Sequence, residues 1–239
     1  MITQDSEIRN GASARLTKNL SQMEKITREL QDLSLSLRMI PIKGTFQKMA
    51  RMVRDLAKKS GKKIEFSMSG EDTELDKSVV DVIGDPLVHM IRNAVDHGIE
   101  ENPEDRLKAG KSEVGHIELN AFHKGGNIYI QIKDDGCGLN KKAILEKAKE
   151  RGIVKNDDKL SDREIYNFIF EPGFSTAKKV TNVSGRGVGM DVVKRNIEAL
   201  HGEIEVDSEW GKGSTFSLRL PLSLAIIDGM VVRIGKERY

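Results

Sequence analysis

Four short clusters of glycine and polar residues, set in one order along the chain, most constrain its fold. They are residues 89–98 (HMIRNAVDHG), 134–139 (DDGCGL), 170–193 and 211–216 (GKGSTF). The first lies on a predicted helix, the second follows a strand, the third opens a helix and the fourth enters a strand. Each alone also suits a capped helix end, a tight turn or a surface loop. Their order indicates a common site.

Apolar periodicity predicts an α+β sandwich, with one mixed sheet covered by helices on one face. Helices are predicted at residues 45–59, 75–97, 140–151, 161–170 and 187–201, and residues 171–185 are predicted to be a loop. Strands are predicted at 64–68, 116–124, 127–135, 202–210 and 214–222. The strands at 116–124 and 127–135 flank Gly125 and Gly126, which predicts a hairpin.

Residues 12–40 carry an apolar stripe with heptad spacing, which is typical of a coiled coil or bundle. The stripe consists of Leu16, Met23, Ile26, Leu30, Leu33, Leu37 and Ile40. Pro41 disfavours the helical conformation at Ile40, so the helix should end there. We interpret residues 1–40 as part of a dimerisation helix. The alternative is a helix that packs on its own downstream domain. We predict that this downstream domain spans residues 41–221 and that residues 222–239 start a further, truncated domain.

The composition excludes several classes of protein. The net charge of +2 is too small to indicate nucleic acid, and no run of about 18 apolar residues predicts a membrane span. The N-terminus lacks a secretion signal. Because Cys137 is the only cysteine, no internal disulfide can form, and the expected location is the cytoplasm.

The first two clusters suggest binding chemistry. His89, Asn93 and Asp96 are spaced to share one face of an α-helix beside apolar residues, where a ligand or metal would supply polar partners. The carbonyl of Asn93 suits Mg²⁺ that is held mostly by phosphates and water. Asp134 can accept a hydrogen bond from an exocyclic amine such as that of adenine, beside glycines that admit a flat ligand.

The third cluster places Gly185, Gly187 and Gly189 before a helix, where free N–H groups and the helix dipole favour phosphate. The spacing is not that of a dinucleotide fingerprint, because no apolar strand precedes it. The preceding loop, with Phe174 and Ser175, is able to close as a lid. A flexible surface loop is the alternative.

The order of the clusters over residues 45–221 resembles the ATP-binding domain of the GHKL superfamily, which unites histidine kinases, gyrase-type topoisomerases, the ninety-kilodalton heat-shock chaperone and MutL. Within it, the segments RMIPI, GEDTELDK, HMIRNAVDHGIE, EPGFST, SGRGVGMDVVK and LPLSLAI resemble the chemotaxis sensor histidine kinases over nearly the whole chain. Where ATPases of the superfamily place a glutamate four residues before the asparagine, this chain has His89.

The resemblance implies catalytic roles for His89, near the γ-phosphate, and for Asn93, which would hold Mg²⁺ and the ATP phosphates. Asp134 would bind the adenine amine. It also implies nucleotide contacts by Asp96, His97, Gly136, Gly138, Leu139, Lys147, Ser175, Gly185, Gly187, Val188, Gly189, Met190 and Ser214. The cofactors implied are therefore ATP and Mg²⁺.

None of the five histidines stands in the context of a sensor-kinase phosphoacceptor helix. The resemblance therefore implies that the acceptor histidine lies on a separate phosphotransfer domain. It also implies a downstream response regulator, self-association through residues 12–40, and recruitment to membrane chemoreceptor arrays through a receptor-coupling adaptor. The alternatives are a GHKL ATPase switch of the gyrase, MutL or chaperone type, and a nucleotide-binding module without catalysis.

Overall fold

The computed structural model describes residues 14–36, 38–154, 160–174, 189–222, 233–234 and 237–238. The chain divides into two compact units, Met1–Met39 and Ile40–Tyr239. Of the predicted site residues, Ser175, Gly185, Gly187 and Val188 lie outside the described residues. The remaining predicted site residues all belong to the second unit.

The first unit contains one long helix, α2 (Ala14–Ser36). Its apolar stripe is exposed, with Met23, Leu30 and Leu33 each more than 60% accessible. The predicted continuation of this helix to Ile40 is wrong, because Met39–Pro41 form the short strand β1. Pro41 restricts the residue before it to extended conformations, and that restriction acts on Ile40.

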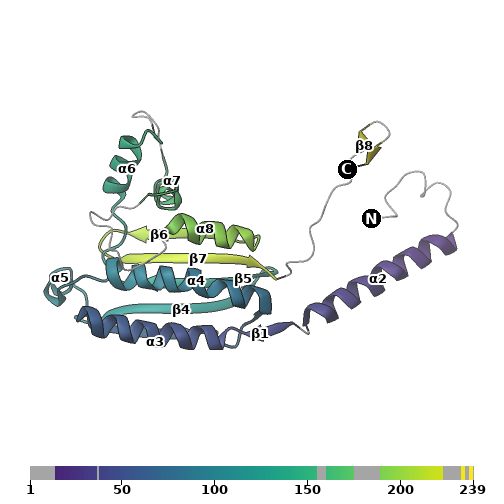
Figure 1. Cartoon of the computed structure of the whole chain (residues 1–239), viewed down its shortest axis with the longest axis horizontal. Helices are drawn as coiled ribbons and strands as arrows, with labels where there is room; N and C mark the ends of the chain where they lie inside the picture. The colour runs from purple at the N-terminus through teal and green to yellow at the C-terminus, as the bar shows by residue number, and fades with distance from the viewer. Residues whose placement is uncertain are drawn as a thin grey trace. The chain divides into compact units, whose positions relative to one another are not determined.

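The second unit is built on a five-stranded mixed sheet with the order β2-β4-β5-β7-β6 (Figure 1). Strands β2 and β4 are parallel, and the other neighbours are antiparallel. The bounds are β2 (Ile64–Ser69), β4 (Gly115–Lys124), β5 (Asn127–Asp134), β6 (Glu203–Glu209) and β7 (Gly213–Pro221). The predicted mixed sheet and the hairpin at Gly125 and Gly126 are confirmed.

Two small ladders accompany this sheet. Strand β1 pairs with β3 (Glu74–Asp76), and β8 (Arg233–Ile234) pairs with β9 (Glu237–Arg238). Most of the segment that was predicted to start a further domain lies outside the described residues.

Helices α3 (Lys43–Ser60), α4 (Lys77–Asn93) and α8 (Met190–Ala199) cover one face of the sheet (Figure 1). Alternate residues of β5 show why: Ile128, Ile130 and Ile132 are buried in the main core, whereas Lys133, which follows Ile132, is exposed. The short helix α5 (Pro103–Lys108) lies in the connection between α4 and β4.

A second hydrophobic cluster forms beside β6. It joins α6 (Lys141–Glu150), α7 (Asp162–Asn167) and the 3₁₀ turn η3 (Phe168–Phe170). A capping box starts α7: the Ser161 side chain accepts from the Glu164 backbone N–H, and the Glu164 carboxylate accepts from the Ser161 N–H at 2.7 Å. The predicted helix at 161–170 is therefore an α-helix that tightens into a 3₁₀ turn.

The predicted helix at 75–97 is confirmed, with a later start and a change of helix type in its last turn. Helix α4 begins only at Lys77, where the Asp76 side chain caps it by accepting from the Ser78 N–H at 2.8 Å. It ends at Asn93 and continues as a π-helical turn, η2 (Ala94–Gly98). The Lys62 ammonium donates to the carbonyl oxygens of Val95 (2.7 Å) and Ile99 (2.7 Å), which stabilises this turn.

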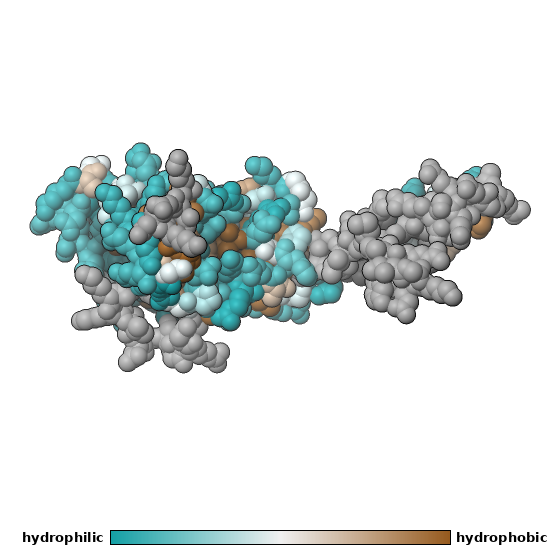
Figure 2. All heavy atoms as spheres, turned by 90° about the horizontal axis from the view of Figure 1, so that it is seen from above, coloured by the Kyte–Doolittle hydropathy of each residue, from teal (hydrophilic) through white to brown (hydrophobic). Residues whose placement is uncertain are grey.

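The surface of the described part is mainly hydrophilic in the view of Figure 2, with hydrophobic side chains visible between hydrophilic ones. Among the described residues, none of the helices is both long enough and apolar enough to cross a lipid bilayer.

Candidate functional site

The first contact of the site joins α4 to the start of α8. The Asn93 side-chain amide nitrogen donates to the sulfur of Met190 at 3.2 Å, so the third cluster meets the first although 97 residues separate them. The amide oxygen of Asn93 carries the lone pairs of this side chain and is therefore the end suited to a cation. His89 lies one helical turn before Asn93 on α4.

His89 is half-buried, and burial lowers its pKa below the ordinary 6.5. The charge of Arg92 also lowers this pKa, and the interaction with His97 lowers it more weakly. The charge of Asp191 on α8 raises it. The net effect keeps the imidazole neutral at pH 7. Asp96 and His97, which were predicted to extend the polar face of His89 and Asn93, lie on the π-helical turn η2 and are exposed.

Arg92 is a residue that sequence reasoning missed. Its Nε is the one buried side-chain nitrogen or oxygen without a hydrogen-bond partner in the part of the chain that the structure describes. An unpartnered buried N–H of a guanidinium is costly, and an anionic oxygen would satisfy it. The only sequence signal was its place beside Asn93, and an arginine on a helix more often lies on a solvated face.

Asp134 ends β5 and is only 4% exposed. Burial raises its pKa from 3.8 to about 6, although the backbone N–H groups of Gly136 and Ser214 oppose the rise. The Gly136 N–H donates to its carboxylate at 3.0 Å. Asp134 is therefore a desolvated carboxylate that accepts a hydrogen bond from the turn that follows it, and it has the capacity to accept another.

The glycines around Asp134 bring backbone segments together. A Cβ on Gly136 would lie 2.0 Å from the Gly98 carbonyl oxygen, and one on Gly138 would lie 2.4 Å from that of Glu209. Gly213 has φ +117°, and its Cβ would lie 2.0 Å from the Asp134 carbonyl oxygen. The absence of side chains at these positions thus lets segments of this chain's own backbone approach one another closely around Asp134.

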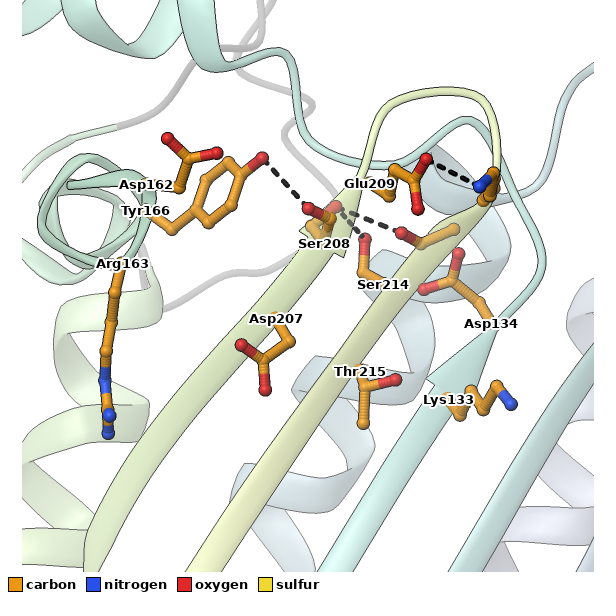
Figure 3. Close-up of a pocket in the computed structure, with 12 residues that line it drawn as sticks. Lys133, Asp134, Asp162, Arg163, Tyr166, Asp207, Ser208, Glu209, Ser214 and Thr215 are labelled. Atoms are coloured by element: carbon orange, nitrogen blue, oxygen red, sulfur yellow. Dashed lines mark hydrogen bonds and ion pairs between the residues drawn. The ribbon is translucent and has the colours of Figure 1, made fainter.

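Ser214 is buried and belongs to a hydrogen-bonded group centred on Ser208, which the sequence did not reveal. The Ser208 hydroxyl accepts from the Leu139 N–H at 2.8 Å, donates to the Gly213 carbonyl at 3.1 Å and lies 3.1 Å from the Ser214 hydroxyl. The Tyr166 hydroxyl donates to the Ser208 carbonyl at 3.0 Å (Figure 3). This group fixes the turn after Asp134 to the β6–β7 hairpin.

Residues 83–224 match the family described as "Histidine kinase-, DNA gyrase B-, and HSP90-like ATPase". The chain belongs to this family. It is 49% identical over 226 residues to the chemotaxis protein CheA of Bacillus subtilis, across 94% of this chain and 34% of that protein. It is 52% identical over 226 residues to the sensor histidine kinase CheAY of Helicobacter pylori, across 94% and 28%. The chain thus spans about a third of the length of such relatives.

Among solved structures, the mycobacterial sensor histidine kinase MprB is 15% identical, with a TM-score of 0.49 over 77% of this chain and 97% of that chain. The family assignment rests on the match over residues 83–224. With the mixed sheet and its single helical layer, it confirms the predicted GHKL-type α+β fold.

The described residues of this member of the histidine kinase-like ATPase family offer a metal ion few side-chain ligands. Among the described residues, His, Cys, Asp and Glu do not gather in groups of three or more that could hold a metal. The Asn93 amide oxygen is a hard donor that fits Mg²⁺ when phosphates and water complete the shell. The residues therefore fit an ion that arrives with a polyphosphate.

The predicted phosphate contact Lys147 lies on α6, the helix that follows the turn after Asp134. Its ammonium lies 5.8 Å from the centre of the Phe174 ring, and the Arg151 guanidinium lies 5.5 Å from it. Phe174 is itself buried in the second hydrophobic cluster. Both cations thus gather where the predicted lid begins, at the last described residue before residues 175–188.

A cavity of about 350 Å³ also borders Asp134 and Ser214 (Figure 3). Its lining includes Lys133, Thr215 and Asp207, whose side chains come from three adjacent strands. His89, Asn93 and Met190 do not line it. It is therefore distinct from the group of residues on α4 and α8.

Proposed function

We propose that this chain is the ATP-binding catalytic core of a chemotaxis protein-histidine kinase. It would bind Mg²⁺-ATP and transfer the γ-phosphate in trans to a histidine on a separate phosphotransfer domain. The observation that carries the proposal is the arrangement of α4 and α8: the Asn93 side chain contacts Met190 at the start of α8. His89, whose pKa is lowered by burial, lies one turn before Asn93. Relatives with about 50% identity that are named CheA support the chemotaxis assignment.

The nucleotide would bind with its two ends held by different elements. Asp134 would accept from the adenine amine, and it does so most strongly as the carboxylate, which predominates above its pKa of about 6. Asn93 would hold Mg²⁺, which neutralises phosphate charge when it is bound. The unpartnered Nε of Arg92 and the backbone N–H groups at Gly189 and Met190 would bind phosphate oxygens.

The remaining predicted contacts complete this proposal. His97 and Asp96, on the turn after α4, would border the phosphates. Gly136, Gly138, Leu139 and Ser214 would shape the adenine end, and Lys147 with Ser175, Gly185, Gly187 and Val188 would enclose the phosphates from the lid.

Transfer would depend on positioning and charge rather than on covalent work by this chain. An imidazole nitrogen of the partner would attack the γ-phosphorus while the bond to the β–γ bridging oxygen breaks and ADP departs. His89 would act beside the γ-phosphate as a neutral group. Its neutrality avoids a second cation next to Arg92, whose charge already lowers the His89 pKa.

An ATPase switch is the less well supported reading. Water activation would need a carboxylate base near Asn93, and the position one turn before it is His89. Asp191 is near enough for its charge to act on His89, but its carboxylate is paired with Arg195 at 3.0 Å. Because that carboxylate is already engaged by Arg195, the kinase reading is preferred.

The proposal extends to the flanking segments and partners. Residues 1–40 would be part of a dimerisation domain that self-associates through the stripe on α2, residues 41–221 the catalytic domain, and 222–239 the start of a regulatory domain. Through that last domain a receptor-coupling adaptor would recruit the cytoplasmic kinase to membrane chemoreceptors. The phosphotransfer domain would then pass the phosphoryl group to a response regulator.

The decisive experiment measures transfer from γ-labelled ATP with Mg²⁺ to an added histidine phosphotransfer domain of a chemotaxis kinase. Label on the added domain, and not on this chain, is expected. A phosphotransfer domain with its acceptor histidine replaced by glutamine is the matched control. Release of free phosphate without labelled protein would support the ATPase switch, and neither product would leave a binding module.

A further inference from the structure

A cluster of four charged side chains, with the buried Arg106 at its centre, lies next to the turn that follows Asp134. Arg106, only 1% exposed, contacts the Glu100 carboxylate at 2.6 Å and the Asp135 carboxylate at 2.7 Å. Lys111 contacts Glu100 at 2.8 Å. These four residues, the Arg106 cluster, combine two cations and two anions, so their formal charges cancel.

The Arg106 guanidinium uses its fork of donors in several directions at once. Besides the two carboxylates, its Nε donates to the Ser112 carbonyl at 2.8 Å and its Nη2 to the Val114 carbonyl at 3.2 Å. The second oxygen of Asp135 accepts from the His116 N–H at 2.8 Å. Asp135 is thus held on both carboxylate oxygens, in a geometry that the point charge of a lysine would not reproduce.

The Arg106 cluster also holds the backbone of the turn itself. The Lys111 ammonium donates to the carbonyl oxygens of Asp135 at 2.7 Å and Gly136 at 2.6 Å. On the other side, the Cys137 N–H donates to the Gly98 carbonyl at 2.8 Å. Asp134 precedes these residues directly and accepts from the Gly136 N–H, so the conformation of this turn sets the position of its carboxylate.

Stability alone is a weak reason for such a cluster. Burying charges costs desolvation, and well-packed apolar side chains of similar volume are often as stable. The directional bonds of the cluster instead specify one conformation of the turn. We propose that Arg106, through Asp135, is a positioning residue that fixes the Asp134 carboxylate for the adenine amine and so sets the preference for adenine over guanine. This inference rests on the proposed function.

The test is Arg106→Lys, which keeps the charge and removes the fork. Equilibrium binding of ATP and GTP with Mg²⁺ should show about a tenfold weaker Kd for ATP, the equivalent of one hydrogen bond, and less than about a twofold change for GTP. Arg219→Lys is the matched control, because Arg219 makes an exposed ion pair with Glu203 at 2.6 Å. It should leave both affinities unchanged.

The ratio of the two affinities separates positioning from simple support of the fold, which would weaken ATP and GTP equally. Equal losses for the two nucleotides, or no loss, in a folded Arg106→Lys protein would overturn the inference. If that variant does not fold, Asp135→Asn decides in the same way. Wild-type protein that fails to bind ATP, or binds GTP equally well, would contradict the proposed function instead.

Discussion

Asp134→Asn should stabilise the nucleotide-free protein at neutral pH while weakening ATP binding. In the folded chain burial raises the pKa of Asp134 to about 6, compared with 3.8 for an ordinary aspartate. The folded state therefore binds this proton more tightly than the unfolded state does. The folded protein carries no penalty below pH 3.8, loses stability as pH rises towards 6, and carries the full penalty above that.

The size of the penalty follows from the two values. The difference 6 − 3.8, at about 1.4 kcal/mol per pH unit, gives an upper limit of about 3 kcal/mol. Asparagine has nearly the same shape, can still accept from the Gly136 N–H, and does not ionise. The free energy of unfolding of the variant relative to wild type should rise by up to this amount between pH 4 and 7, then level off.

Urea unfolding followed by far-UV circular dichroism at half-unit steps from pH 4 to 7.5 measures this difference directly. Other carboxylates titrate in both proteins and cancel in the comparison. Exposed Asp207→Asn on β6 makes the same chemical change without the burial and serves as the control. A difference between variant and wild type that stays constant over this range, or grows towards low pH, would refute the reasoning.

Three further variants test the site. Asn93→Asp should weaken Mg²⁺-dependent ATP binding by at least about tenfold, because it disturbs the bond to Met190 and the proposed ion ligand; an unchanged Kd with Mg²⁺ would contradict the metal role. His89→Gln should slow phosphoryl transfer about 10²-fold with little change in ATP affinity, and equal losses would make His89 a binding residue only. Gly136→Ala should lower the free energy of unfolding by about 1–3 kcal/mol, because its Cβ would meet the Gly98 carbonyl. Gly84→Ala, in open space within α4, is its control and should raise that energy by about 0.5–1 kcal/mol.

The types and order of most elements follow from the sequence, because apolar spacing depends only on local geometry. Alternation in residues 127–134 predicts β5, and the stripe through Phe46, Met49 and Val53 predicts α3. The order of the glycine clusters predicts the family and brings Asn93, Asp134 and Met190 into one hypothesis. A capping box such as Ser161 with Glu164 is equally local.

The features that the sequence missed all depend on contacts between distant segments. The π-helical turn after Asn93 is stabilised by the ammonium of Lys62, 33 residues before Val95. The pKa of Asp134 is about 6 only because the folded chain surrounds its carboxyl group. The role of Ser208 follows only from the contact between the β6–β7 hairpin and the turn at Leu139. From the sequence, Arg106 is expected to be a surface residue of a short helix, and only the fold buries it and gives it Glu100 and Asp135 as partners. Local periodicity therefore determined the elements, whereas burial and long-range hydrogen bonds, which no local pattern encodes, decided the chemistry of the site.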